Sequence, residues 1–522
     1  MPYYLSMKPF RIAVCQLRAH GIEQAEENLQ GILEALDDAG AAGAQLVVLP
    51  ECSYPAYYLR DRDPWAREGV RDYFEFLSLL SNAAERHGYW LAAGFARCTD
   101  AGELRNSAML FGPDGAPGGH YDKSFLWHFD SDWFTPGCEY PVFDLGFAKV
   151  SALICADGRM PEIARSLSLA GAEVILDLTA WVSSGRDAAA LTNPQVEYFM
   201  PVRAMENGVW IAAADKWGEE AGSIVYAGRS CVINPLGEMV ALAPSEGSTV
   251  LVHDVVPMTT ELLPRRPRLY TRLAEETPKL PVMPVMDEPV VPSALEGRVT
   301  VVPSPRTFDA AALAARYREL RAQTTNLVVF GGMDGPEGWQ VGLGELEAAV
   351  KEAGGAMVVG VATTSCSAQQ SVVLITPEVT VEHVATHGRG IQHGELESPV
   401  VATPGGNVAL LCGDEALAPE IARCLMLAGA DIIAWPAFQE LPLHESLVRT
   451  RADENRVYIA AAWPGGAMVA APNGAPVAVT PRGMEVAMTA AVNKTVARVK
   501  DMAPGTNVVR NRIPSAYGSL VK

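Results

Sequence analysis

The sequence has few of the features that mark membrane-bound, secreted or disulfide-bonded proteins. No apolar run is long enough to span a membrane, and the first ten residues, MPYYLSMKPF, lack the long apolar region of a signal peptide. The nine cysteines form no CxxC pair and no regular framework, so we expect reduced thiols. These absences predict a cytoplasmic protein that has no membrane partner.

Positive charge is also scarce. The chain has 41 Lys and Arg against 61 Asp and Glu, a formal net charge of −20. A net negative protein is repelled by phosphate, which argues against nucleic acid or an anionic membrane as a partner. The substrate stays open, because the local field at a site can oppose the global charge. The 522 residues, 49% of them hydrophobic, predict a globular protein of two or three domains.

Buried-strand and helical patterns alternate along the first half of the chain. Such alternation indicates an α/β layered fold. The predicted strands are 11–16, 45–49, 89–96, 106–111, 150–154 and 173–178, and the predicted helices are 23–42, 73–87 and 161–169.

The same order of segments begins again after a proline-rich stretch at residues 275–296, which has no helical period and reads as a semi-rigid linker. Five segments beyond it match the first half in order; the last pair is RAMENGVWIAAA (203–214) and RADENRVYIAAA (451–462). The sequence therefore predicts an internal duplication. We expect a catalytic domain at 1–273, a linker at 274–297 and a second domain at 298–522.

Residues 148–181 contain the most informative pattern. The strand at 150–154 ends at Cys155, turn residues follow, and Pro161 stands where a first helical position tolerates proline. A thiol at such a turn lies near a helix N-terminus, whose partial positive charge favours the thiolate. This arrangement predicts a cysteine nucleophile at the end of a sheet strand.

Two charged residues also follow predicted strands: Glu51 after QLVVLP and Lys123 after HYD. Together with Cys155 in CADGRMPE, the segments LVVLPE, YDKSFLW, FTPG, NPLGEMVAL and PRLY resemble the nitrilase (carbon–nitrogen hydrolase) superfamily. The resemblance covers residues 8–273 and extends over 298–522 as a degraded copy. It implies two tandem α-β-β-α sandwich domains that pair within one chain as a pseudo-dimer.

The resemblance also implies roles that suit each residue chemically. Cys155 would attack the carbonyl carbon, and Glu51 would act as general base toward the thiol and later toward water. Lys123 would stabilise the oxyanion, with the backbone N–H of the residue after the cysteine, and would lower the pKa of the thiol. Asp130 stands where the family has a second glutamate. No metal or organic cofactor is required.

The residues that follow Cys155 indicate which branch of the family the chain resembles. Nitrile-cleaving members carry W-E after the cysteine, whereas Ala156–Asp157 here looks like the amidase and carbamoyl-amide branches. Asp157 and Arg159 are expected to form an ion pair that holds the turn, with substrate contact as the alternative. An aromatic wall would suit a small, partly apolar amide. The residues expected to contact substrate are Tyr54, Tyr57, Tyr58, Trp181 and Ala156, with core packing as the alternative for the tyrosines.

The second half departs from the pattern at the chemical positions. Gly332 stands in the place of Glu51, and counting ten residues from the matched prolines puts His387 at the lysine position. Cys412 remains in LLCGDEALAPE, with one extra residue before the proline. A cysteine without its carboxylate and lysine is a poor amide hydrolase, so this half is expected to be inactive.

The leading functional hypothesis is hydrolysis of a small linear amide through a Cys155 thioester, with release of ammonia or an amine. Hydrolysis of a carbamoyl amide is the close alternative, and acyl transfer to an amine is also open. A non-catalytic scaffold or binding protein is the rival of another class, which the intact Glu51–Lys123–Cys155 set opposes. Higher oligomers of the pseudo-dimeric chain are left open.

Overall fold

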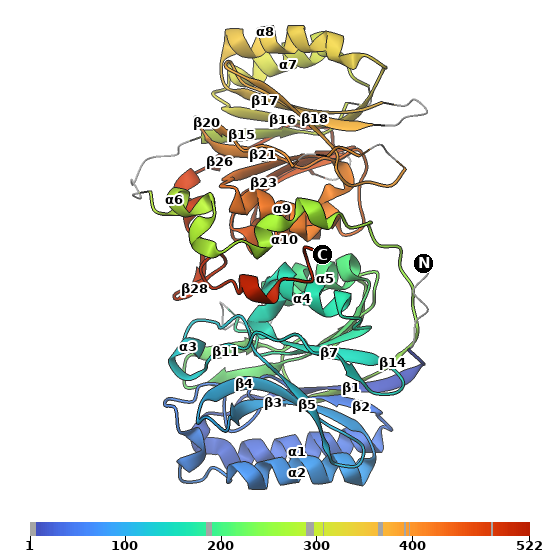
Figure 1. Cartoon of the computed structure of the whole chain (residues 1–522), viewed down its shortest axis with the longest axis vertical. Helices are drawn as coiled ribbons and strands as arrows, with labels where there is room; N and C mark the ends of the chain where they lie inside the picture. Colours follow the sequence, from blue (N-terminus) through green and yellow to red (C-terminus); the bar gives the residue numbers. More distant parts are fainter. Residues whose placement is uncertain are drawn as a thin grey trace. The chain divides into compact units, whose positions relative to one another are not determined.

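The computed structural model describes residues 7–183, 191–288, 297–305, 307–363, 369–390, 393–395, 397–481 and 484–522. The chain forms two compact units (Figure 1). The first unit is Met1–Leu262 with Ala503–Thr506, and the second is Leu263–Met502 with Asn507–Lys522. Among the described residues, no helix has both the length and the apolarity needed to cross a membrane.

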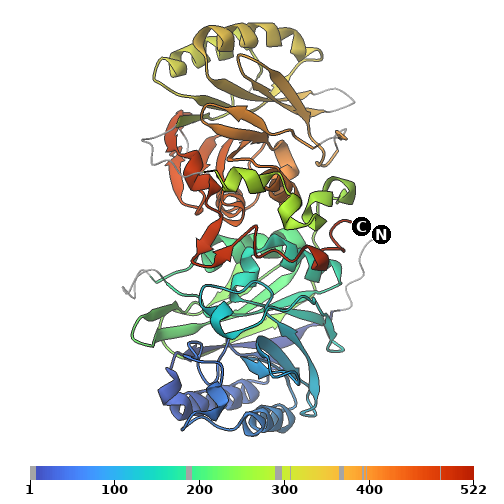
Figure 2. The ribbon, with the colours of Figure 1, turned by 60° about the vertical axis from the view of Figure 1, so that its left-hand side comes forward.

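The first unit is an α-β-β-α sandwich (Figures 1 and 2). Its eight-stranded sheet has the order β11-β10-β1-β2-β3-β4-β5, with β14 also paired to β1, and its six-stranded sheet has the order β13-β12-β9-β8-β7-β6. The strands of the eight-stranded sheet are β1 Phe10–Arg18, β2 Leu46–Val48, β3 Trp90–Cys98, β4 Leu104–Phe111, β5 Pro117–Asp122, β10 Lys216–Glu220, β11 Ile224–Ala227 and β14 Thr249–Val255. The strands of the six-stranded sheet are β6 Phe143–Asp144, β7 Lys149–Ile154, β8 Val174–Leu178, β9 Trp210–Ala214, β12 Cys231–Ile233 and β13 Met239–Leu242. The helices are α1 Ala25–Ala41, α2 Tyr73–His87, α3 Asp130–Trp133, α4 Pro161–Leu169 and α5 Met200–Asn207.

Local signals explain why the helices of this unit begin and end where they do. The side chain of Asp72 accepts hydrogen bonds from two N–H groups in the first turn of α2, and the helix ends at Gly88, whose φ is +69°. The buried faces of α1 and α2 pack on the eight-stranded sheet in one apolar cluster, which includes Leu29, Phe76 and Leu91. The helical spacing seen in the sequence is therefore the spacing of core contacts.

The second unit repeats this architecture, which confirms the predicted duplication and fold class. Helices α7 and α8 cover a sheet of order β19-β18-β17-β16-β15-β26, and α9 and α10 cover a sheet of order β20-β21-β22-β23-β24-β25. The first sheet comprises β15 Gly297–Val302, β16 Leu327–Gly335, β17 Ala356–Thr363, β18 Gln370–Ile375, β19 Thr380–Val384 and β26 Met488–Val492. The second comprises β20 Val401–Thr403, β21 Gly406–Leu410, β22 Ile432–Pro436, β23 Tyr458–Trp463, β24 Gly466–Ala470 and β25 Pro476–Val479. The other elements are α6 Val282–Met286, α7 Ala310–Arg321, α8 Leu343–Ala353, α9 Pro419–Leu427, α10 His444–Asn455, α11 Lys494–Arg498, β27 Asp501–Ala503 and β28 Thr506–Asn507.

Strand pairing gives a residue-by-residue match between the units. In the first unit Val150 of β7 pairs with Val174 of β8, which pairs with Trp210 of β9. In the second unit Val408 of β21 pairs with Ile432 of β22, which pairs with Tyr458 of β23. Helices α4 and α9 have nine residues each and begin at Pro161 and Pro419, which anchors the match. With this anchor, the strand pairs identify the positions in the second unit that match the chemical residues of the first.

The boundary between the units falls before the predicted linker. Arg266 donates to the carbonyl oxygens of Thr386 and Gly394, and Tyr270 lies 2.6 Å from His387 Nε2, so this stretch belongs to the second unit. The predicted linker contains the short helix α6, and its last part, 289–296, lies outside the described residues. The expected pairing of the two halves stays a prediction.

Candidate active site

Glu51 follows strand β2 of the first unit and is fully buried. A Cβ at Gly94 of β3 would lie 2.3 Å from the Pro50 carbonyl oxygen, so glycine permits the close approach that places Glu51 against the sheet. Asn106 Nδ2 of β4 donates to Glu51 Oε1 at 2.7 Å. Glu51 Oε2 has no hydrogen-bond partner among the described residues.

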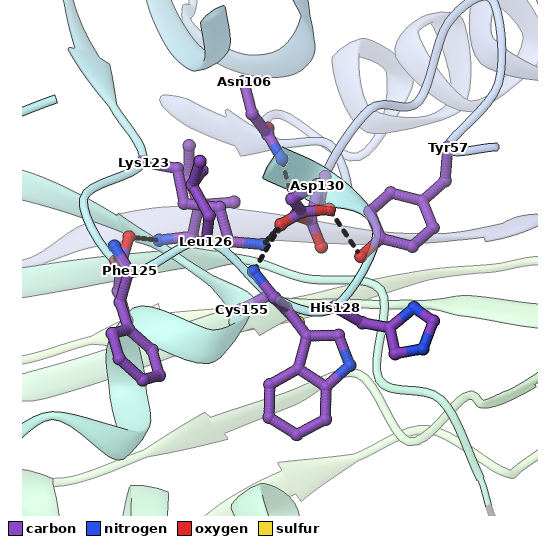
Figure 3. A network of polar contacts seen from close by, with 12 residues as sticks. Tyr57, Asn106, Lys123, Phe125, Leu126, His128, Asp130 and Cys155 are labelled. Atoms are coloured by element: carbon purple, nitrogen blue, oxygen red, sulfur yellow. Dashed lines mark hydrogen bonds and ion pairs between the residues drawn. The ribbon is translucent and has the colours of Figure 1, made fainter. Parts of the chain in front are cut away.

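Lys123 follows β5, which pairs with β4, and its side chain reaches Glu51 from this other strand of the same sheet. Its Nζ lies 2.6 Å from Glu51 Oε1 and 2.6 Å from Asp130 Oδ2, and all three side chains are buried (Figure 3). Burial alone would lower the pKa of Lys123, but the carboxylates of Asp130 and Glu51 outweigh burial and raise it well above its usual value. Lys123 is therefore a fixed ammonium group.

Asp130 is the first residue of α3, where its carboxylate has three donors. Oδ2 accepts from Lys123 and from the N–H of Trp127 at 2.9 Å, and Oδ1 accepts from the Tyr57 hydroxyl at 3.0 Å. The segment before α3 is also held by Thr506 of this unit, whose Oγ1 accepts the His128 N–H at 2.7 Å. The aspartate thus reaches the lysine despite being one methylene shorter than glutamate.

Cys155 ends β7 at a sharp turn. Its φ is +50°, a left-handed conformation that non-glycine residues rarely adopt, and the short helix that follows runs from Cys155 to Arg159. Its N–H donates to Asp177 Oδ1 at 3.0 Å. The cysteine therefore sits on a strained elbow held by a side chain of the adjacent strand.

Asp157 braces this elbow in a different way from the expected ion pair. Its carboxylate accepts from the N–H groups of Ser124 (3.2 Å), Phe125 (2.7 Å) and Ile154 (3.0 Å) and from the Tyr121 hydroxyl (2.8 Å). The expected pairing with Arg159 is wrong, because backbone amides and a hydroxyl surround this buried group. Burial raises the pKa of Asp157 to about 6.

The electrostatics of the thiol also differ from the expectation. Burial and the carboxylate of Glu51 raise the pKa of Cys155 well above its usual value, although Lys123 acts in the opposite direction. The Lys123 ammonium group lowers the thiol pKa by less than burial and Glu51 together raise it. Two carboxylates already lie against the ammonium group. Burial also raises the pKa of Glu51, and Lys123 opposes this rise. The resting site thus holds a neutral thiol.

The residues expected to contact substrate occupy different environments. Tyr57 joins the polar network through Asp130, and Tyr58 packs edge-on against Phe129 and Trp133. Tyr54 instead stacks on Phe76 in the core beside α1 and α2, with ring centroids 4.6 Å apart, which makes it a packing residue. The remaining two, Ala156 and Trp181, are fully buried.

Three further residues contact the predicted set and were missed in the sequence. Asn106 and Asp177 are polar residues inside buried strands, a signal that could have singled them out. Gln195 begins a π-helical turn, which no sequence pattern marks. With its amide in the orientation that satisfies both ends, Gln195 donates to the Cys155 carbonyl oxygen at 2.6 Å and accepts from Trp181 Nε1 at 2.9 Å.

The register of the second unit corrects the position assigned to Cys412. Because Val150 corresponds to Val408, Cys155 corresponds to Gly413 and Cys412 corresponds to Ile154. Gly413 has a φ of +54° and begins the short helix of the second unit, whereas Cys412 is extended at φ −120°. Cys412 is therefore a core residue, and no extra residue precedes the proline.

The lysine position needs a similar correction. Ser107 pairs with Asp122 in the first unit, whereas the matching Ser371 pairs with Val384, because the second hairpin is two residues shorter. Counting ten residues from the matched prolines therefore ends two residues beyond the true counterpart of Lys123. Ala385, not His387, stands at the lysine position, and its N–H donates to Gln370 just as that of Lys123 donates to Asn106.

The second unit also has no room for the missing groups. Gly332 does stand in the place of Glu51, as predicted, but a Cβ there would lie 2.5 Å from Phe438 Cδ1. Phe438 occupies the position that corresponds to Ala180, and a Cβ on Gly413 would lie 3.3 Å from its ring and 2.3 Å from Gln370 Oε1. The second site is therefore filled by an aromatic side chain as well as stripped of its chemical groups.

Comparison with known proteins agrees with this arrangement. Residues 11–265 and 344–501 match the carbon-nitrogen hydrolase family. A nitrilase of Pyrococcus abyssi is 33% identical over 247 residues, which cover 47% of this chain and 89% of that protein. An omega-amidase of Xenopus tropicalis is 30% identical over 258 residues, which cover 48% and 89%. Among solved structures, an amidase from Nesterenkonia sp. is 28% identical with a TM-score of 0.42, and the match covers 48% of this chain and 91% of that one.

The first matched region lies in the first unit except for its last three residues, and the second matched region lies in the second unit. Together these regions span more than half of the chain. The first region includes the buried carboxylate, ammonium and thiol groups, and the second includes the elbow in which glycine replaces the thiol. The family resemblance inferred from the sequence is therefore confirmed. The chain belongs to the carbon–nitrogen hydrolase family, of which it carries two tandem copies.

Proposed function

We propose that the first unit hydrolyses the C–N bond of a small linear amide through a thioester on Cys155, and that it releases ammonia or an amine. Family membership makes carbon–nitrogen hydrolysis of the amidase type the class of reaction. The observation that supports the site is the Lys123 ammonium held 2.6 Å from both Glu51 and Asp130, beside a cysteine on a left-handed elbow. The omega-amidase relatives support an amide as the substrate.

The buried groups divide the work of the reaction. Cys155 Sγ attacks the carbonyl carbon while Glu51 takes the thiol proton, and Oε2 is suited to this because it has no other partner among the described residues. Glu51 then gives the proton to the leaving amine and later activates the water that cleaves the thioester. Lys123 and the N–H of Ala156 stabilise the oxyanion, and Asp130 and Tyr57 hold the lysine in place.

The resting protonation states support proton transfer at the moment of attack. The raised pKa of Cys155 keeps the thiol neutral at rest, because burial and Glu51 disfavour a second anion. Substrate that displaces water and presents its carbonyl to Lys123 gives the new charge a partner. Thiolate formation is then coupled to carbon–sulfur bond formation, so the resting enzyme avoids an exposed reactive thiolate.

Ammonia release by the purified full chain tests this proposal. Wild type, Cys155→Ala and the matched control Cys412→Ala would be compared on small amides, carbamoyl compounds and nitriles. We expect release from amides by wild type and Cys412→Ala and none by Cys155→Ala. Equal release by Cys155→Ala would overturn the site, and release from carbamoyl compounds alone would overturn the substrate class in favour of the carbamoyl alternative. Hydroxamate formed in the presence of hydroxylamine would report the thioester.

A further inference from the structure

A second carboxyl group lies directly behind Cys155. Asp177 is the last but one residue of the buried strand β8, and its Oδ1 accepts the Cys155 N–H at 3.0 Å. Its side chain is fully buried, and Oδ2 has no hydrogen-bond partner among the described residues. A half-satisfied carboxyl group inside a parallel strand costs free energy, so this position calls for a reason other than packing.

The second unit builds the same turn without this carboxyl group. Because β8 and β22 share one register, Asp177 corresponds to Trp435, whose Nε1 donates to the Gly413 carbonyl oxygen at 2.8 Å. The φ of Gly413, +54°, is close to the +50° of Cys155. Glycine adopts this conformation freely, whereas cysteine does not. The carboxyl group is therefore present in the unit whose elbow carries a side chain.

A neighbouring position follows the same rule. Asp215, which comes after β9, accepts the Trp181 N–H at 2.7 Å, and the matching residue of the second unit is Trp463. In that unit His444 lies between the two tryptophans, with ring centroids 4.5 Å from Trp435 and 4.2 Å from Trp463. In the second unit, which lacks the cysteine, these two positions are occupied by aromatic side chains that pack together. In the first unit, which has the cysteine, the same two positions carry carboxyl groups.

We propose that Asp177 is a positioning residue for Cys155: by accepting its N–H, Asp177 holds a non-glycine residue in the left-handed elbow and fixes the place of the thiol. This inference rests on the proposed role of Cys155 as nucleophile. The hydrogen bond compensates for strain that glycine avoids at Gly413. Asp177 acts through the backbone of Cys155 and does not touch the substrate.

The protonation state of Asp177 suits this role. The titratable groups around it are Glu51 after β2, Lys123 after β5, Asp157 and Cys155 on the short helix, Asp215 after β9 and Cys231 in β12. Burial, with Glu51 and Asp157, raises the pKa of Asp177 well above its usual value, which favours the neutral acid over the carboxylate. A neutral acid still accepts the N–H, whereas an ionised one would raise the pKa of the thiol.

Two substitutions in the full chain separate the hydrogen bond from the charge. Asp177→Asn keeps an acceptor oxygen, and Asp177→Val removes it. We expect Asp177→Val to lower kcat by about tenfold or more, with KM within about twofold, because the Cys155 N–H loses its buried partner. We expect Asp177→Asn to stay within about threefold of wild type in kcat, since the acceptor is restored.

The rate of Cys155 alkylation by iodoacetamide, followed by peptide mass spectrometry against pH, gives a readout that needs no substrate. The exposed Cys98 and Cys138 of the same chain serve as internal standards. Asp177→Val should slow alkylation at every pH. Asp177→Asn should shift the alkylation midpoint to lower pH, because it cannot become an anion beside the thiol. A purely structural role would not produce that shift.

Asp215→Val is the matched control, because it removes the other buried carboxyl group of this layer without touching Cys155. It should lower the thermal midpoint about as much as Asp177→Val does and leave the alkylation midpoint of Cys155 unchanged. The proposal is overturned if Asp177→Val alkylates like wild type, if Asp177→Asn is as slow as Asp177→Val, or if its midpoint does not move. Failure of amide hydrolysis in wild type would overturn the proposed function and leave these alkylation results readable.

Discussion

The two units share one backbone plan and differ at the few positions where chemistry takes place. Glu51, Lys123 and Cys155 of the first unit correspond to Gly332, Ala385 and Gly413 of the second. Both elbows have a positive φ, so the fold of the turn does not depend on the nucleophile. The comparison teaches that the sandwich tolerates loss of the Glu51, Lys123 and Cys155 side chains, provided that other side chains, here Phe438 and Gln370, fill the space.

The largest expected effect on activity comes from replacing Cys155 by glycine, the residue that the second unit has at the same position. Cys155→Gly should lower kcat/KM by more than about 10³-fold, because it removes the nucleophile from a backbone that glycine adopts easily. Adding Gly413→Cys should restore nothing, since Gly332 and Ala385 supply neither base nor ammonium group. Steady-state kinetics on the best substrate measures both. Recovery of activity in the double variant would contradict the conclusion that the second unit lacks the groups needed for catalysis.

Lys123→Ala copies the second unit at the lysine position. It leaves the buried carboxylates of Glu51 and Asp130 without their cation, so we expect a loss of about 3–5 kcal/mol in stability and about 10²–10³-fold in kcat. Adding Asp130→Asn should recover part of the stability and none of the activity. Thermal unfolding and kinetics would show this, with the exposed Lys149→Ala as the control. Unchanged stability would mean that Lys123 does not offset the cost of burying the carboxylates of Glu51 and Asp130.

The pH profile should show the base that the second unit lacks. Glu51 must be ionised to take the thiol proton, and burial raises its pKa, so kcat/KM should fall as pH drops through a value above the ordinary carboxyl pKa of about 4.3. The hydrogen bond from Asn106 lowers the pKa of Glu51, so Asn106→Ala should move this acidic limb upward by about one unit.

Ser107→Ala is the control for the pH experiment, because Ser107 is next to Asn106 on β4 but bonds Asp122 instead of Glu51. It should leave the acidic limb where it is. A limb that moves downward in Asn106→Ala would contradict the assignment of Glu51 as the base.

The smallest effect concerns packing in the second unit. Gly332→Ala places a Cβ 2.5 Å from Phe438 Cδ1, so overpacking should lower the stability of that unit by about 1–3 kcal/mol. In a Phe438→Ala background the same substitution should cost about 1 kcal/mol less, since the clash is gone. Denaturant unfolding of the four proteins of this double-mutant cycle measures the coupling. Additive effects would show that Phe438 does not fill the vacant site.

The sequence by itself determined the elements and the charged set of the first unit. Residues 73–87 and 161–169 were predicted as helices and are α2 and α4, because a capping aspartate, a terminal glycine and Pro161 are local signals. The positions of Glu51 and Cys155 after strands were also readable, since each directly follows a short apolar run of buried-strand type. That they meet across two different sheets was not readable. Family membership followed from the motifs around them.

Only the tertiary structure decided which residue of the second half stands at the lysine position, and what state the site is in. Ala385 could be identified only through strand register, because the shorter hairpin breaks the count from the matched prolines. Gly413, by contrast, also follows from counting back from the PEIAR segment that both halves share. Tyr54 packs in the core while Tyr57 binds Asp130, although both flank the same motif. The neutral thiol follows from burial and from charges that are distant in sequence. Desolvation and long-range pairing depend on what surrounds a residue in space, which local sequence does not encode.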